Sequence, residues 1–256
     1  NEFSSGMQDI SAIKHFLKMF YDRATNASEM PKYLLLFGDG SYDNRTRNIV
    51  TNTNFVPTYQ SENSTDQTKS YVSDDYYGLL DDNESDGLAQ LMDIGVGRFP
   101  SKTKAEAQAM VNKTINYEML VSPSGSPGAK ENADWKNVVC FVADDEDGNT
   151  HLTDAETIST YVDTNFRNIN IDKIYFDAYK QVSTAGGERY PDVTAAINQR
   201  VKSGSLILNY TGHGGETGWA HERVLDVSTI NAWDNNNKLP LFVTATCEFS
   251  RFDDPA

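Results

Sequence analysis

Apolar positions along the second half of the chain alternate between two spacings. Short, β-branched apolar runs that are typical of buried strands are separated by stretches in which apolar residues recur every three or four positions. The expected strands cover 137–142, 171–176, 205–210 and 241–246, and the expected helices cover 153–166, 191–201 and 228–234. Alternation of this kind predicts a mostly parallel sheet flanked by helices, which is an α/β fold.

The first half of the chain has a less regular pattern. Ile10, Ile13, Leu17 and Phe20 fall on one face of a helix expected over residues 7 to 22. A capping-box pattern from Thr103 to Glu106 opens a second helix that runs to about residue 120. Strands are expected at 33–37, 71–72, 76–80 and 91–96, and a polar surface excursion at 41–70.

Residues 122–128 are rich in Ser, Pro and Gly and interrupt every periodic pattern. We therefore predict an N-terminal α/β subdomain at 1–120, a linker at 121–133 and a catalytic α/β subdomain at 134–256. No apolar run reaches the roughly 18 residues that a membrane-spanning helix needs. The chain begins at Asn1 without a signal peptide, so we expect it to be a segment of a longer protein.

A net charge of −15 makes nucleic acid an unexpected partner, because phosphate binding needs clustered Lys and Arg. Acidic residues gather in the runs 81–86 and 144–147. Such runs are typical of solvated loops, and structural calcium is the alternative, although neither run has EF-hand spacing. No other cofactor and no metal ion is expected.

His213 and Cys247 each follow a predicted strand directly. If those two strands are parallel neighbours, both side chains reach the carboxyl edge of one sheet, where open α/β folds place their chemistry. A thiol attacks as the thiolate, and a histidine is its usual proton acceptor. The pair therefore predicts a cysteine hydrolase.

Gly212, Gly214 and Gly215 surround His213 and would let a substrate approach the backbone closely. The amides of Gly214 and Cys247 are the candidate oxyanion hole, which is worth roughly 3 kcal/mol per donor. Three alternatives stay open from the residues alone. His213 could be a structural histidine, Cys247 could be a buried thiol, and the two could belong to a zinc site.

The chain has a second cysteine, Cys140, inside the apolar run 138–142. A thiol in that setting is expected to be buried and unreactive. Two cysteines are too few to predict a disulfide framework, so cysteine usage does not settle the cellular compartment.

The segment 209–219, Asn-Tyr-Thr-Gly-His-Gly-Gly-Glu-Thr-Gly-Trp, closely resembles the catalytic-histidine region of the gingipain family of cysteine peptidases. Residues 239–247 resemble the nucleophile strand of that family. Further resemblance lies at 33–39, 73–78 and 94–99, so it extends from about residue 30 to the end of the chain. It implies a caspase-like (gingipain-like) fold with two subdomains, of which the C-terminal part is missing here, since family members continue well past the nucleophile.

The same resemblance implies roles for individual residues. Cys247 is the implied nucleophile and His213 the implied acid–base residue. The acid that orients the histidine would fall on Asp145, with Asp144 as the second candidate. Arginine-specific members carry a further acid where this chain has His151, which argues against arginine specificity; His151 and Trp219 are the expected substrate-binding residues.

Residues 247–255 resemble the sortase-like branch of the family, which acts in the type IX secretion system. That branch implies a cell-surface enzyme of a Bacteroidetes-type bacterium. Its partners would be the C-terminal signal domains of secreted cargo and other secretion components, with an anionic lipopolysaccharide as a possible acceptor. A secreted general protease of the gingipain type and a catalytically silent cargo-binding domain are the two alternatives.

Overall fold

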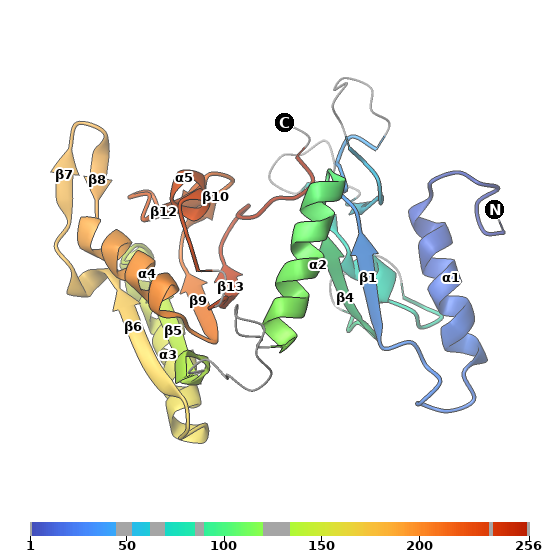
Figure 1. Ribbon diagram of the computed structural model, residues 1–256, viewed down its shortest axis with the longest axis horizontal. Helices are drawn as coiled ribbons and strands as arrows, with labels where there is room; N and C mark the ends of the chain where they lie inside the picture. The colour runs from blue at the N-terminus through green and yellow to red at the C-terminus, as the bar shows by residue number, and fades with distance from the viewer. Residues whose placement is uncertain are drawn as a thin grey trace. The chain divides into compact units, whose positions relative to one another are not determined.

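The computed structural model of the chain consists of two compact units, which comprise Asn1–Asn112 with Phe252–Ala256, and Lys113–Arg251 (Figure 1). The residues that it describes are 2–44, 53–61, 70–84, 90–119, 134–235 and 238–254. The predicted linker at 121–133 lies outside the described residues. None of the described helices is both long enough and apolar enough to cross a bilayer.

The first unit pairs two parallel strands, β1 (Tyr33–Phe37) and β4 (Gly95–Phe99). Helix α1 (Ile10–Arg23) begins at Asp9, whose side chain accepts a hydrogen bond from the Ser11 amide. The buried residues of this core come from the helix, the strands and the segment between them: Leu17, Leu36, Tyr77, Leu80 and Ile94. The expected helix at 7–22 and the expected strand at 33–37 are therefore confirmed.

Two strand predictions in this unit are wrong. Residues 75–78 form a 3₁₀ helix, η1 (Asp75–Gly78), where a strand at 76–80 was expected, because the ring of Tyr77 turns inward and its hydroxyl donates to the carbonyl of Pro57. The strand expected at 91–96 lies later, as β4. Two short strands, β2 (Tyr59–Gln60) and β3 (Val72–Ser73), pair antiparallel.

Arg98 joins three of the segments on which the family resemblance rests. Its guanidinium pairs with the carboxylate of Asp74 at 2.6 and 2.8 Å and donates to the carbonyls of Gly38 and Val56, both at 2.8 Å. Because planar guanidinium–carboxylate pairs are directional, this contact fixes the ends of β1 and β4 against the 73–78 segment. These motifs therefore serve the architecture of the first unit.

The second unit is built on a four-stranded sheet in the order β13-β9-β5-β6, and every neighbouring pair is parallel. The strands are β5 (Val138–Ala143), β6 (Asn170–Tyr175), β9 (Ile207–Thr211) and β13 (Leu241–Ala245). All four strands predicted for this half are present, and the predicted parallel sheet is confirmed. The continuous apolar sequence of β5 reflects burial on both faces of the sheet, whereas Leu241 and Val243 on one face of β13 are exposed.

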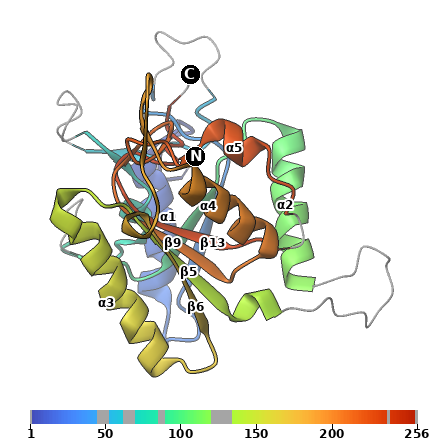
Figure 2. The same ribbon diagram turned by 90° about the vertical axis from the view of Figure 1, so that its left-hand side faces the viewer.

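Helices α3 (Thr150–Asn165) and α4 (Pro191–Ser203) lie on opposite faces of this sheet (Figures 1 and 2). Val193, Ile197 and Val201 of α4 join the same buried core as Cys140 and Leu208 of the strands. Helix α3 begins at Thr150, three residues before its predicted start at 153. Short helices complete the unit: α5 (Val227–Asn231), η2 (Asp134–Asn137), η3 (Asp147–Asn149) and η4 (Phe176–Ala178).

Helix α2 (Lys104–Met119) has the predicted capping box: the Thr103 hydroxyl accepts from the Glu106 amide and the Glu106 carboxylate accepts from the Thr103 amide, both at 3.2 Å. Sequence patterns missed the small antiparallel elements. These are the hairpin of β7 (Val182–Thr184) with β8 (Gly187–Arg189), and the sheet of β10 (Gly214–Gly215), β11 (Gly218–Trp219) and β12 (Leu225–Asp226). Strands of two or three residues are too short to show a periodicity.

Candidate active site

Three loops meet at the carboxyl edge of the four-stranded sheet, because β9 lies between β5 and β13. In the register, Thr211 at the end of β9 is opposite Ala143 on one side and Ala245 on the other. Two backbone hydrogen bonds extend the pairing beyond the strands, from the Asp144 amide to Thr211 and from the Gly212 amide to Ala245. The loops after all three strands are therefore held side by side.

His213 and Cys247 occupy equivalent places in two of these loops, each two residues beyond the register pair Thr211–Ala245. Adjacent parallel strands lie about 4.8 Å apart, so this register brings the two residues to the same stretch of the sheet edge. A β-carbon placed on Gly214 would collide with the hydroxyl oxygen of Thr246, which shows that the two loops are in contact beside both residues.

The backbone turns sharply just after Cys247. Glu248 has a φ of 49° and Ser250 a φ of 61°, a left-handed conformation that costs about 1–3 kcal/mol for residues other than glycine. Cys247 itself is exposed. The turn therefore leaves the thiol at the surface, which removes the alternative of a buried cysteine.

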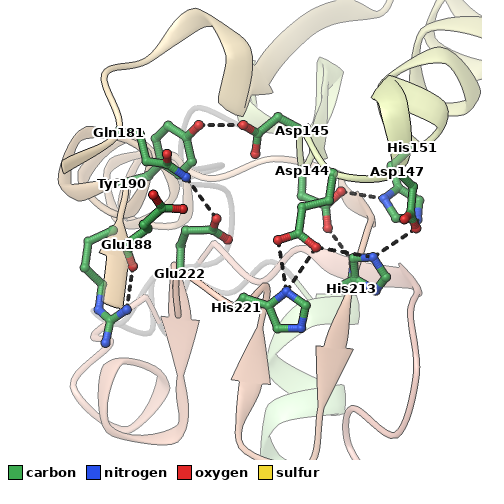
Figure 3. A network of polar contacts seen from close by, with 12 residues as sticks. Asp144, Asp145, Asp147, His151, Gln181, Glu188, Tyr190, His213, His221 and Glu222 are labelled. Carbon is green, nitrogen blue, oxygen red and sulfur yellow. Dashed lines mark hydrogen bonds and ion pairs between the residues drawn. The ribbon is translucent and has the colours of Figure 1, made fainter. Parts of the chain in front are cut away.

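Asp144, the first residue after β5, holds the histidine loop in place (Figure 3). Its side chain is 1% exposed, and one carboxylate oxygen accepts from the backbone amide of His213 at 2.5 Å. The other oxygen contacts Nδ1 of His151, also at 2.5 Å. A buried carboxylate satisfied on both oxygens is a rigid support, so Asp144 fixes the backbone of His213 and the ring of His151 together.

The carboxylates nearest the His213 ring are Asp147 and Glu146. Nε2 of His213 lies 3.0 Å from Asp147 Oδ2 and 3.5 Å from Glu146 Oε2. Asp145, the predicted orienting acid, instead accepts a hydrogen bond of 2.6 Å from the hydroxyl of Tyr190. The structure does not bring Asp145 to the ring, so its role in orienting His213 stays a prediction without a supporting contact.

Asp147 reaches His213 because of an unusual turn. Asp147, Gly148 and Asn149 have φ values of 53°, 62° and 65°, three consecutive residues in the left-handed region. Gly and Asn adopt this conformation readily, which makes the turn possible. The turn ends β5's loop, starts α3 and places Asp147 and His151 on the same side as His213.

Three imidazole rings, those of His151, His213 and His221, are in contact at this edge of the sheet. The rings of His151 and His213 meet edge to face with centroids 4.9 Å apart, and those of His213 and His221 stack at 5.3 Å. Nδ1 of His221 lies 2.9 Å from a Glu146 oxygen, and this contact raises the pKa of His221 above its ordinary value. The cationic form of His221 is therefore favoured.

A groove of about 590 Å³ adjoins His213 and is lined by the glycine-rich loop, His221 and Arg223. Glycines along its wall give an extended peptide access to the backbone. Trp219 does not line it. Trp219 is fully buried and stacks flat on Tyr210, with ring centroids 4.2 Å apart, so any influence on substrate must act through the shape of the loop.

The two cysteines differ as the sequence predicts. Cys140 is fully buried in β5, and burial raises the pKa of its thiol to about 12. At neutral pH such a thiol is protonated and unreactive. Cys247 is therefore the thiol available for chemistry.

The profile of peptidase family C25 matches residues 1–256, which is the full length of the chain. The chain belongs to peptidase family C25. It is 22% identical to gingipain R2 of Porphyromonas gingivalis (strain ATCC 33277) over 238 residues, which is 93% of this chain and 26% of that protein. It is also 22% identical over 93% of its length to gingipain R1 of Porphyromonas gingivalis, covering 19% of it.

Solved structures show the same fold. The crystal structure of the Arg-specific cysteine proteinase gingipain R superposes with a TM-score of 0.64 at 20% identity, over 95% of this chain and 46% of that one. A complex of the RgpB pro- and mature domains gives a TM-score of 0.62 at 21% identity, over 95% and 47%. The chain therefore spans about a quarter or less of the two curated relatives and about half of these structures.

The predicted family is confirmed. Because the members of this family are cysteine peptidases, the residues at the carboxyl edge of the four-stranded sheet are the candidates for catalysis. The predicted residues His213, Gly214 and Cys247 lie in neighbouring loops there, and His151 joins them through Asp144. Sequence reasoning missed the contacts of Asp147, Glu146 and His221 with the histidine loop. The acidic run 144–147 was visible, but which of its carboxylates turns toward His213 depends on the left-handed turn at 147–149.

Proposed function

We propose that this chain is the catalytic region of a cysteine endopeptidase or transpeptidase, with Cys247 as the nucleophile and His213 as the acid–base residue. One observation supports this proposal most directly. His213 and Cys247 each lie two residues after a paired strand end, Thr211 and Ala245 respectively, and their loops touch at Gly214 and Thr246. Cys247 is exposed, and the groove beside His213 provides access for a peptide.

In this reaction His213 accepts the thiol proton, and the Cys247 thiolate attacks the carbonyl carbon of the scissile peptide bond. The resulting oxyanion is stabilised by the proposed donors, the amides of Gly214 and Cys247. The C–N bond then breaks, and His213 returns the proton to the leaving amine. The thioester that remains is resolved by water, which gives hydrolysis, or by an amine, which gives transfer.

Asp144 supports this step by holding the His213 backbone amide, and the Asp147 carboxylate stabilises the imidazolium formed when His213 takes the proton. Asp145 is the family-implied alternative for this second role. His151 occupies the place of an acid that would bind a substrate guanidinium, and its Nδ1 is committed to Asp144. An imidazole there does not attract a guanidinium, so we propose that the substrate is not selected by arginine.

For the substrate we propose the C-terminal signal domain of proteins exported by the type IX secretion system, processed at the cell surface by a PorU-type sortase. The new carboxyl end would pass to water or to an amine on an anionic lipopolysaccharide. Support comes from the resemblance of residues 247–255 to that branch of the family. Structural calcium in the acidic loops is part of the same proposal, and a gingipain-like general protease is its rival.

The test uses the intact parent protein. An acyloxymethyl ketone should label Cys247 with 1:1 stoichiometry, Cys247→Ala should abolish labelling, and Cys140→Ser should leave it in place. Absence of labelling at Cys247 would establish a catalytically silent domain.

Substrate choice is tested with the same preparation. A cargo protein that carries its C-terminal signal should be cleaved by the parent protein and not by the Cys247→Ala variant, with mass spectrometry separating hydrolysis from transfer. Reporter peptides with arginine or lysine should be cleaved much more slowly. Rapid cleavage of those reporters would favour the general protease instead.

A further inference from the structure

Three of the four histidines in the chain, His151, His213 and His221, have their rings in contact, and the Asp147 carboxylate lies close to two of them. One ligand atom each from Asp147, His151 and His213 lies within 4.8 Å of the others. We propose that these three side chains form a binding site for Zn²⁺ or a similar transition-metal ion, and that metal binding there switches off His213. The second half of this inference rests on the proposed function of His213; the first half does not.

The spacing of the ligand atoms suits a tetrahedral ion. Asp147 Oδ2 lies 3.0 Å from His213 Nε2 and 3.8 Å from His151 Nε2. Zinc bonds of about 2.0–2.1 Å at tetrahedral angles place neighbouring ligand atoms about 3.3 Å apart. The two separations from Asp147 are therefore within about half an ångström of the tetrahedral spacing, and rotation of the partly exposed His213 ring can adjust the third, which is at most 4.8 Å.

The ring of His151 is already oriented for coordination (Figure 3). Its Nδ1 contacts the buried Asp144 carboxylate at 2.5 Å, which leaves Nε2 as the nitrogen that faces Asp147. Histidines that bind zinc commonly have a carboxylate on the other ring nitrogen, because it fixes the tautomer and makes the ligand more basic. Asp144 also holds the backbone of His213, so one buried residue positions both imidazole ligands.

The donor set and its exposure favour a borderline-soft ion. Two imidazoles and one carboxylate suit Zn²⁺, Co²⁺ or Cu²⁺, whereas Ca²⁺ and Mg²⁺ prefer oxygen ligands throughout. The Asp147 side chain is 60% exposed, and those of His151 and His213 are 19% and 34% exposed. An ion can therefore enter from solvent and keep water in its fourth position.

Coordination removes the base that the thiol requires. When Nε2 of a neutral imidazole donates its lone pair to a metal, the other nitrogen carries the proton and has no lone pair to accept another. A metal-bound His213 therefore cannot take the proton of Cys247. The bound ion also replaces the contact between Asp147 and His213 that stabilises the imidazolium.

Metal binding is tested without any activity measurement. Titration of the parent protein with Co²⁺ should give visible d–d absorption that saturates at one ion per chain, and Zn²⁺ should abolish it while excess Ca²⁺ does not. His151→Gln and Asp147→Asn should each weaken Zn²⁺ binding at least 10-fold in competition with a chromophoric chelator, and Asp144→Asn about 10- to 100-fold. Unchanged affinity in His151→Gln would overturn the site.

Two matched variants locate the ligands. His15→Gln removes an exposed imidazole on α1 and should keep the 1:1 stoichiometry and affinity. Cys247→Ala should also keep them, because the proposed site contains no thiolate. Loss of binding in Cys247→Ala would show that the ion is held by the thiol and would refute the proposed ligand set.

The effect on His213 is read from the rate at which the acyloxymethyl ketone labels Cys247. In proportion to its occupancy, Zn²⁺ should slow labelling of the parent protein, and a chelator should restore the rate. Labelling that is unaffected at full occupancy would overturn the regulatory inference. A chain that binds Zn²⁺ at these residues but never reacts with the ketone would retain the site and lose the proposed peptidase function.

Discussion

Gly214, the residue after His213, lies directly against the hydroxyl of Thr246, the residue before Cys247. A side chain at position 214 has no room, so the contact sets how closely the histidine loop and the cysteine loop approach each other. Thr246 Oγ1 is buried, and within the described residues it has no hydrogen-bond partner. Gly214 and Thr246 are therefore in van der Waals contact and are not joined by a hydrogen bond from the Thr246 hydroxyl.

Gly214→Ala should separate the two loops and lower kcat/KM by about 100-fold, since a displacement of about 1 Å at reacting groups has that effect. Gly215→Ala is the matched control, because a β-carbon there meets no atom within 4 Å. Adding Thr246→Ala to Gly214→Ala removes the hydroxyl that the new methyl group meets, and should restore part of the activity. Equal losses in the Gly214 and Gly215 variants would contradict this account.

The loss of activity on replacing each aspartate of the 144–147 run should follow how closely that aspartate contacts His213. Asp144→Asn should lower kcat/KM by about 10- to 100-fold, as loss of a supporting carboxylate commonly does, and Asp147→Asn by a smaller factor. Asp145→Asn should have the least effect, because Asp145 bonds Tyr190. Steady-state kinetics of the three variants, with circular dichroism to confirm folding, decides the order. A largest loss in Asp145→Asn would restore the family-implied acid.

His221 should titrate above its ordinary pKa because Glu146 hydrogen-bonds its ring. A raised histidine pKa in the folded state means that this contact stabilises the fold below the unfolded pKa of about 6.5, and that the contribution is lost as pH rises through the folded value. NMR titration of the imidazole signals measures it. Glu146→Gln should lower the pKa of His221 and leave the titration of His15 on α1 unaltered.

Glu222 is 4% exposed, and burial raises the pKa of its carboxyl group, assisted by the neighbouring charges of Glu146 and Asp145. One of its oxygens is buried without a hydrogen-bond partner in the described part of the chain. The neutral acid is thus favoured in the folded state, and ionisation destabilises the fold as pH rises through the raised pKa.

Glu222→Gln should therefore gain stability relative to the parent protein as pH rises from about 4.3, the ordinary pKa of a glutamate, through the raised pKa, as measured by urea unfolding at each pH. Glu188→Gln, which changes an exposed acid on β8, is the control and should show a flat difference. A difference that narrows toward pH 8 would contradict the raised pKa.

Sequence patterns located the long elements well because each carries a complete periodicity. The four strands of the second unit and helices α1, α2 and α4 lie close to their predicted bounds. Sequence patterns failed where a short apolar segment is compatible with more than one secondary structure. The aromatic run at 76–80 resembled a strand, but burial of Tyr77 against Pro57 made it a 3₁₀ turn.

The sequence by itself determined that His213 and Cys247 follow buried strands, that glycines surround the histidine and that Cys140 is a core residue. Those properties are local, because they depend on neighbours along the chain. Only the tertiary structure decided which carboxylate faces His213, since Asp144, Asp145, Glu146 and Asp147 are adjacent and chemically alike. Each of these four acids contacts a different set of partners. The partners are determined by the left-handed turn at 147–149 and by loops that are distant in the sequence.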